Sequence, residues 1–191
     1  MDAIRKSAKK IRHAGWGTLT EYEIGYRHAD GTEQNLTREV YDHGHAAAVL
    51  LVDAEARELT LVRQFRMGAY VNGDADPHLL EVCAGLLDGD TPEACARKEA
   101  IEETGIAPKT LGHAFDLYAS PGSLTEKVHC FLGSYDATCR VSDGGGLRHE
   151  GEDIEVVTIP FADALAMTRN GIIVDAKTVA LIQYAALEGL L

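Results

Sequence analysis

The chain has 191 residues, of which 46% are hydrophobic and 25% are charged, so it holds enough apolar material for one sizeable core. Its 18 basic and 30 acidic side chains give a formal net charge of −12. Such a charge opposes non-specific binding to nucleic acid or to an anionic membrane, and we expect neither as a partner.

The lack of a recognisable span or signal peptide and the usage of cysteine indicate the same cellular compartment. No apolar run approaches the roughly 20 residues that a membrane span needs, and the basic stretch at residues 1–12 lacks the apolar segment of a signal peptide. The four cysteines form no Cys-x-x-Cys pair, and we expect free thiols: Cys83, Cys95, Cys130 and Cys139. These features predict a cytoplasmic protein.

Strand patterns dominate the first part of the chain. Alternating runs at residues 18–26 and 33–41 flank an Asp30-Gly31 pair, which is typical of a hairpin. Apolar runs predict further strands, at residues 46–52, 59–63, 79–84, 111–118, 127–135 and 154–159. Between the strands, turn residues predict loops at 72–77 and 120–123 and a mobile glycine hinge at 144–146.

Helices are predicted mostly later in the chain. The first covers residues 92–104, because Thr91-Pro92 is a strong helix start and Gly105 a typical end. Two more are predicted at residues 160–169 and 175–187. Strands first and helices interleaved late predict an α+β sandwich and not a doubly wound parallel sheet.

Three carboxylates crowd the end of the first predicted helix. Glu99, Glu102 and Glu103 stand at i, i+3 and i+4, so they share one helix face. Like charges at these spacings oppose each other, and anions in a last turn oppose the helix dipole. A hard divalent cation reverses that balance, since Mg²⁺ and Mn²⁺ prefer carboxylate and carbonyl oxygens. The cluster therefore predicts a metal site.

The segment from Gly85 to Ile106 resembles the signature of the Nudix hydrolases, Gly-x5-Glu-x7-Arg-Glu-U-x-Glu-Glu-x-Gly-U, with U a bulky aliphatic residue. Its second half fits closely, whereas the first loop is one residue shorter, Asp90 replaces the Glu and Lys98 replaces the Arg. The same shortened form is similar to that of the GDP-mannose pyrophosphatase subgroup. Further blocks of that subgroup extend the resemblance from about Trp16 to Tyr184.

This resemblance implies a Nudix α/β/α sandwich with a mixed β-sheet at residues 45–191, preceded by an antiparallel β-hairpin region at 1–44 that serves dimerisation. It also implies a homodimeric pyrophosphohydrolase that needs Mg²⁺, or Mn²⁺, and cleaves a nucleoside diphosphate sugar. GDP-mannose, giving GMP and mannose 1-phosphate, is the favoured substrate. The alternatives are ADP-ribose hydrolysis and, in another class, a sensor of nucleotide sugars that has lost catalysis.

The metal and catalytic residues are carried over from the resemblance. It implies that Glu99, Glu103 and Glu152 coordinate metal, helped by the Ala84 carbonyl. Catalysis is assigned to Glu102, Glu103 and Glu152, with Glu152 a metal ligand or general base. The segment 148–151 is one or two residues longer than in similar sequences, so Glu150 is an alternative to Glu152 as metal ligand or base. Glu102 is a further alternative for the base.

Substrate contacts are also implied by the resemblance. An aromatic side chain at Trp16 would stack on the base from the partner subunit, and Arg66 would bind phosphate. Sites are then shared between two subunits. The full set of implied substrate residues is Trp16, Arg38, Glu39, Arg66, Gly85, Leu86, Glu126 and Lys177.

Overall fold

The structure is a computed structural model that describes residues 4–190; the side chains of Lys6, Ser7 and Glu150 are not described. Contacts divide the chain into two compact units. The N-terminal unit holds the residues before Ala46 together with Tyr118–Lys127, and the C-terminal unit holds Ala46–Leu117 and the chain from Val128 onward. No helix of the described residues is long and apolar enough to cross a membrane.

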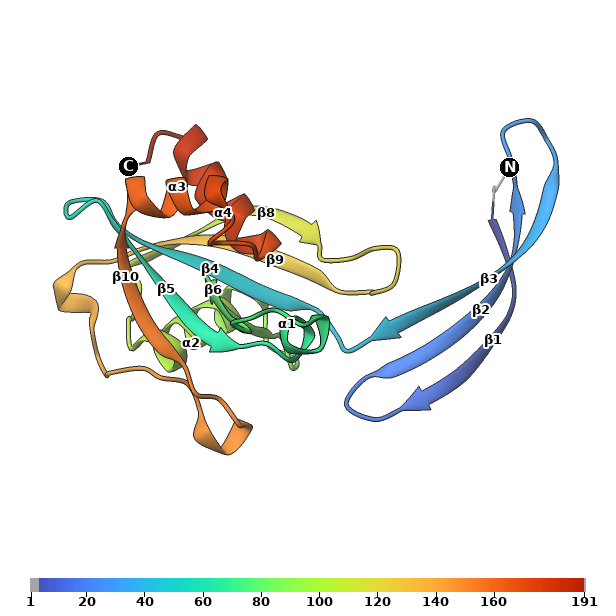
Figure 1. The fold of residues 1–191 in the computed structure, drawn as a ribbon, viewed down its shortest axis with the longest axis horizontal. Helices are drawn as coiled ribbons and strands as arrows, with labels where there is room; N and C mark the ends of the chain where they lie inside the picture. Colours follow the sequence, from blue (N-terminus) through green and yellow to red (C-terminus); the bar gives the residue numbers. More distant parts are fainter. Residues whose placement is uncertain (1–3, 191) are drawn as a thin grey trace. The chain divides into compact units, whose positions relative to one another are not determined.

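The N-terminal unit is built on a three-stranded antiparallel sheet (Figure 1). Its strands are β1 (Ile4–Ala14), β2 (Thr18–Arg27) and β3 (Glu33–Asp42). The hairpin at Asp30-Gly31 is confirmed, since Glu33 pairs with Arg27 across it. β1 was not predicted, because its sequence is too basic to show the alternation of a half-buried strand.

The C-terminal unit is built on a seven-stranded mixed sheet, as the α+β prediction requires. The main order is β10-β5-β4-β9-β8, with β6 beside β5 and β7 beside β4. The β4–β9 pair is parallel, and β4 pairs with β5 and with β7 in antiparallel fashion. The strands are β4 (Ala46–Asp53), β5 (Glu58–Phe65), β6 (His78–Glu81), β7 (Cys83–Leu86), β8 (Thr110–Tyr118), β9 (Lys127–Ser134) and β10 (Glu155–Pro160).

β4 explains the layering of this unit, because both of its faces are buried. Ala48 and Leu50 belong to one hydrophobic cluster, whereas Val49 and Leu51 belong to another. Successive strand residues point to opposite faces, so a continuous apolar run is what a strand covered on both sides needs. The sequence Ala46–Val52 is such a run and is buried throughout.

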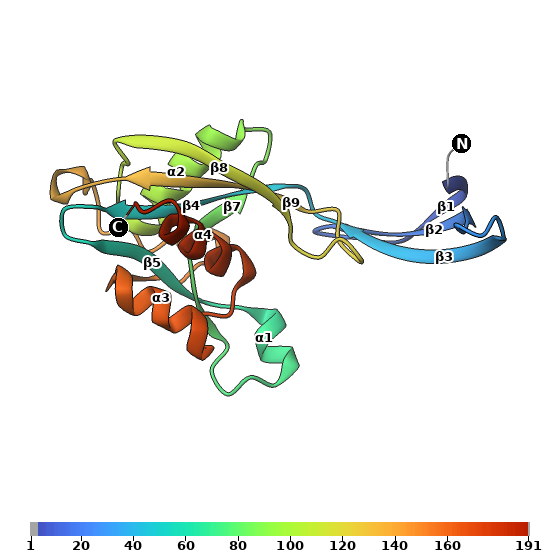
Figure 2. The ribbon, with the colours of Figure 1, turned by 90° about the horizontal axis from the view of Figure 1, so that it is seen from above.

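Helices cover the two faces of the sheet (Figures 1 and 2). Helix α2 (Pro92–Thr104) packs on one face through Cys95, Ala96 and Ala100. Helices α3 (Phe161–Asn170) and α4 (Ala176–Leu187) pack on the other face, where Phe161, Ala164 and Leu181 belong to the same cluster as Ala48 and Leu50. This arrangement is the α/β/α sandwich that the resemblance implied.

Local capping signals place two of these helices where the sequence predicted them. The Thr91 side chain accepts the Ala94 N–H at 3.3 Å, and α2 ends at Gly105 with φ of 73°, a left-handed conformation that glycine adopts without strain. The Asp175 side chain accepts the Thr178 N–H at 3.0 Å and so starts α4.

In the C-terminal unit one predicted strand is wrong and one helix was not predicted. The single strand at 79–84 is two strands, since β6 pairs with β5 and β7 pairs with β4. A short helix α1 (Met67–Asn72) precedes the predicted loop; with six residues and no buried side chain, it has no periodicity to detect. Two 3₁₀-helices, Ala137–Cys139 and Arg148–Glu150, complete the described elements. All four cysteines are free, as predicted, and all four are buried.

Candidate active site on helix α2

Helix α2 brings two carboxylates to its buried face. Glu99 and Glu103 are one turn apart and are 9% and 1% exposed, respectively, whereas Glu102 is half-buried. The helix reaches this position because Cys95, Ala96 and Ala100 on the same side pack on the sheet without bulk. Two acidic side chains are therefore forced into the protein interior beside each other.

Strand β7 supplies the opposite wall of the site. The Ala84 N–H donates to Glu103 Oε2 at 3.2 Å, and a Cβ at Gly85 would collide with the Glu99 carboxylate. The Cys95 thiol contacts the carbonyl oxygens of Gly85 and Leu86 at 3.5 and 3.3 Å. The backbone at 84–86 thus lies directly against the glutamates, and a side chain at position 85 would displace the Glu99 carboxylate.

The shortened loop before α2 forms a tight turn. Asp88 and Gly89 have φ of 46° and 96°, and the Asp90 N–H donates to the Leu87 carbonyl at 2.7 Å, the pattern of a type I′ turn. Lys98 Nζ lies 3.8 Å from Asp90 and 3.5 Å from Glu99 Oε1. The two residues that depart from the family signature, Asp90 and Lys98, therefore pair with each other.

The electrostatics of this cluster favour an added positive charge. Burial raises the pKa of Glu99 to about 7, with Glu102 and Glu152 adding repulsion, although Lys98 opposes the shift. Burial, and then the charges of Glu99 and Glu152, raise the pKa of Glu103 well above its ordinary value. Two buried carboxylates with hard oxygen donors fit a divalent cation of the Mg²⁺ class, which would offset the charge that burial disfavours.

The glycine run 144–146 ties a loop to the end of α2. The N–H groups of Gly145 and Gly146 donate to the carbonyls of Glu103 and Glu102 at 2.9 and 3.1 Å. All three glycines have φ between 71° and 102°. The sequence predicted a mobile hinge, but these hydrogen bonds make the run a cap for the last turn of α2.

The same loop carries Glu152 toward the helical glutamates. Glu152 Oε2 accepts the Leu147 N–H at 2.8 Å, and its charge acts on both Glu99 and Glu103. The structure therefore gathers Glu99, Glu102, Glu103 and Glu152 within one C-terminal unit. The side chain of Glu150, the competitor for the role of Glu152, lies outside the described residues.

A second group of charges lies beside these acids. Glu81 accepts two hydrogen bonds from Arg66, at 2.6 and 2.8 Å, and a third from Lys177 Nζ, which also lies 3.0 Å from Asp175. Burial opposes ionisation of Glu81, but the Arg66 hydrogen bonds and the Lys177 charge together lower its pKa. The charge of Arg66 also acts on Glu103, so the two groups interact.

Glu81 and Asp175 were missed by reasoning from the sequence. Glu81 offered a signal, since a lone carboxylate within the apolar stretch Leu79–Cys83 must find a buried partner. Asp175 was recognised only as a helix start. The side-chain Nε2 of Gln64 is also buried, and it has no hydrogen-bond partner among the described residues.

The remaining predicted substrate residues lie in the N-terminal unit. Trp16 follows β1, is 75% exposed and stacks on His43 at a ring distance of 5.0 Å. Arg38 and Glu39 are exposed neighbours on β3, opposite Tyr22 and Glu21. Glu126 is half-buried in the segment 118–127 of the same unit. The four belong to a different unit from the glutamates of α2.

Comparison with known proteins identifies the class. The family model described as "NUDIX domain" matches residues 42–181. The chain therefore belongs to the Nudix family. Residues 4–41 match a second description, "GDP-mannose pyrophosphatase NudK N-terminal domain". Nudix hydrolases generally use divalent metal ions, which agrees with the donor set on α2.

Several curated relatives extend over nearly the whole chain. The GDP-mannose pyrophosphatase of Cronobacter sakazakii is 50% identical over 182 residues, covering 95% of this chain and 94% of its own. That of Yersinia enterocolitica is 46% identical over 188 residues, covering 98% and 97%. Among solved structures, an ADP compounds hydrolase superposes with a TM-score of 0.75 at 17% identity and covers 99% of this chain and 96% of its own, which establishes the fold.

Proposed function

We propose that this protein is a Mg²⁺-dependent pyrophosphohydrolase that cleaves GDP-mannose to GMP and mannose 1-phosphate. Water adds at one phosphorus, and the bridging P–O bond breaks. Relatives named GDP-mannose pyrophosphatase at 44–50% identity support this substrate. The observation that carries the proposal is the buried pair Glu99 and Glu103, whose ionised form is disfavoured by burial unless a cation lies nearby.

The carboxylates would hold the metal. Glu99, Glu103 and Glu152 are assigned as ligands together with the Ala84 carbonyl, and Glu102 stands beside them. When bound, Mg²⁺ offsets charge on the diphosphate and lowers the pKa of a coordinated water. Glu152 is the proposed base, because its loop is anchored to α2 through Gly145 and Gly146 and its charge acts on both buried acids. Glu102 and Glu150 remain the alternatives.

The cations would bind the substrate's phosphate oxygens. Arg66 and Lys177 are both held by Glu81, so their positive charges are fixed before substrate arrives and little ordering is needed on binding. Gly85 and Leu86 would contact substrate through backbone at the same wall. In a protein with a net charge of −12, such local cations are what a polyanionic substrate requires.

We propose a homodimer in which residues 1–44 form the dimerisation region and residues 45–191 the hydrolase domain. β1 is exposed at every described side chain, and Ile4 and Ile11 on it are 52% and 62% exposed. A three-stranded sheet with little burial needs a covering surface to be stable. Trp16, Arg38, Glu39 and Glu126 would then serve the partner's site. The free thiols suit a reducing compartment, and we propose the cytoplasm.

The activity is tested by turnover of GDP-mannose and ADP-ribose at matched concentrations, with products separated by chromatography. We expect GDP-mannose to be preferred and EDTA to abolish turnover. Glu103→Gln should lose at least about 100-fold in kcat while keeping the fold. Glu93→Gln is the matched control, since Glu93 is an exposed acid in the first turn of the same helix.

The outcomes of this assay separate the alternatives. A large preference for ADP-ribose would replace the substrate proposal and leave the metal centre intact. Nucleotide-sugar binding without turnover in the wild-type protein would favour the sensor. Turnover unchanged by thorough chelation would contradict the whole mechanism.

Sharing of sites between subunits has its own test. Glu103→Gln and Arg38→Ala chains, each inactive as homodimers, are unfolded together and refolded as a mixture. In an equal mixture about half of the dimers are heterodimers, and a shared site leaves one of the two sites in each heterodimer complete. A shared site therefore predicts that about a quarter of the wild-type activity returns. Activity that stays at the level of the separate variants would contradict sharing.

A further inference from the structure

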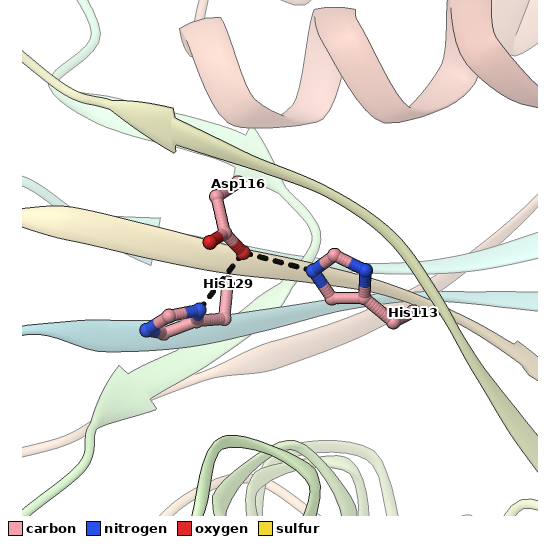
Figure 3. Close-up of side chains that lie close together, drawn as sticks. All are labelled: His113, Asp116 and His129. Atoms are coloured by element: carbon pink, nitrogen blue, oxygen red, sulfur yellow. Dashed lines mark hydrogen bonds and ion pairs between the residues drawn. The ribbon is translucent and has the colours of Figure 1, made fainter.

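Three side chains with metal-binding atoms meet on the β8 and β9 strands of the C-terminal unit, separate from the acids of α2 (Figure 3). His113 Nε2 and His129 Nδ1 each lie 2.8 Å from the same oxygen, Asp116 Oδ1. The three ligand atoms are all within 4.8 Å of one another. None of these residues takes part in the proposed hydrolysis.

The cluster is held by the fold and remains open to solvent. His113 and Asp116 are on the same strand, β8, and His129 comes from its neighbour β9. The His113 ring meets the buried Phe131 edge to face at 5.5 Å, which restrains its orientation. The side chains of His113, Asp116 and His129 are 52%, 38% and 21% exposed, so an ion from solvent can reach them.

The chemistry of the cluster differs from that of the acidic site. Two imidazole nitrogens and one carboxylate oxygen form a donor set that suits Zn²⁺ and neighbouring transition metals, whereas Mg²⁺ prefers oxygen alone. As the structure stands, both rings must present an N–H to one carboxylate oxygen. The two hydrogen bonds lower the pKa of Asp116, that of His113 contributing most, so this carboxylate is held in its ionised form.

We propose that His113, Asp116 and His129 form a second metal site, which binds a divalent transition-metal ion of the Zn²⁺ class through three protein atoms. The ion binds each ring at the nitrogen that faces Asp116, the proton of that nitrogen moves to the other nitrogen of the neutral ring, and the fourth position of the ion is open to water or another ligand. Bridging β8 to β9, it fastens the edge strand β8 to the sheet. Mg²⁺ does not occupy this site.

The test is a calorimetric titration of the untagged, full-length protein with Zn²⁺ in excess Mg²⁺, which saturates the acidic site. We expect one Zn²⁺ per chain and a rise in melting temperature. His113→Ala, His129→Ala and Asp116→Ala should each weaken this binding at least about tenfold. His78→Ala is the matched control: His78 also pairs with an aspartate, Asp76 at 2.9 Å, but no second histidine joins them among the described residues.

A second measurement uses the wild-type protein and so does not depend on how well the variants fold. In nitrogen-detected NMR of the wild-type protein, Zn²⁺ should shift His113 Nε2 and His129 Nδ1 selectively. Glu103→Gln should retain the Zn²⁺ titration, which separates this site from the acidic one. Three results would overturn the proposal: absence of Zn²⁺ binding by the wild-type protein, Zn²⁺ binding by all three site variants that is as tight as that of the wild type, or loss of Zn²⁺ binding in Glu103→Gln.

Discussion

Glu81 accepts hydrogen bonds from both Nε and Nη2 of Arg66, at 2.6 and 2.8 Å, while its own side chain is only 2% exposed. Paired contacts of this kind fix the plane of a guanidinium group. Lys177 contacts the same carboxylate from α4. One buried anion thus sets the positions of two cations that we assign to phosphate binding.

Glu81→Gln should impair substrate binding more than chemistry. The amide keeps the size of the side chain but removes the charge between Arg66 and Lys177, so the two cations repel each other and Arg66 loses its fixed orientation. We expect KM to rise about tenfold with a smaller change in kcat, and stability to fall by about 1–3 kcal/mol. Steady-state kinetics and urea unfolding measure the two effects.

Glu155→Gln is the matched control for that change. Glu155 lies 3.4 Å from Arg63 on the same sheet, but its side chain is 64% exposed. An exposed pair contributes about 0–1 kcal/mol, so this variant should behave as wild type. Equal effects of the two substitutions would show that burial of Glu81 is irrelevant to the role assigned to it.

Gly85→Ala should weaken metal binding while leaving the fold intact. The added methyl group would collide with the carboxylate of Glu99, which is the end of a flexible side chain and can move away. We expect metal affinity and turnover to fall at least about tenfold, with stability changed by less than about 1 kcal/mol. Gly112→Ala on β8 is the control, because its methyl group would meet nothing within 4 Å. Normal Mg²⁺ binding by Gly85→Ala would remove Glu99 from the ligand set.

The metal-free protein should lose stability as the pH rises from about 4.5 to 7. Glu99 has a pKa of about 7 in the folded chain against an ordinary 4.5, so between these values the folded chain holds more protons than the unfolded one. Its contribution is complete below pH 4.5 and is lost as the pH passes 7, a fall on the order of 3 kcal/mol. Urea unfolding in EDTA at pH 5 and pH 8 measures it.

Excess Mg²⁺ should remove most of this decline, because the cation favours the ionised carboxylates. The double variant Glu99→Gln/Glu103→Gln should show the smaller decline without any metal, since neither buried acid of α2 remains to ionise. A decline of equal size in the double variant would place its origin elsewhere in the chain.

Gly144→Ala should both destabilise the protein and slow turnover. Gly144 has φ of 71°, and its added methyl group would press on the backbone of Thr104 at the end of α2. We expect a loss of about 2–4 kcal/mol and displacement of the loop that carries Glu152. Gly151→Ala has a similar φ of 81° with open space around it, so it should cost only about 1 kcal/mol. Comparing the two variants by thermal unfolding isolates the collision from the backbone strain.

The parts of the fold that could be predicted from the sequence are those with strong local signals. Thr91, Gly105 and Asp175 carry capping chemistry that acts over three or four residues, and the structure confirms them. The apolar run of β4 likewise required cover on both faces. The division of residues 79–84 into two strands was not accessible, because it depends on partners far along the chain, β5 and β4.

The candidate site shows the same limit. The spacing of Glu99 and Glu103 predicted a shared helix face, and their burial agrees with it. That the glycine run 144–146 caps α2 could not be seen in the sequence, since a glycine run is equally typical of flexible linkers. The pairing of Asp90 with Lys98 was also hidden, because each appeared only as a separate departure from the family signature.

The double-sided burial of β4 ties the two helical layers into one cooperative unit. Residues at 46, 48 and 50 touch the layer of α3 and α4, while those at 47, 49 and 51 touch the layer of α2, so neither layer can detach without exposing this strand. The amide protons of β4 should therefore exchange with solvent only through global opening. Those of β1, whose described side chains are all exposed, should exchange by local fraying in the isolated chain.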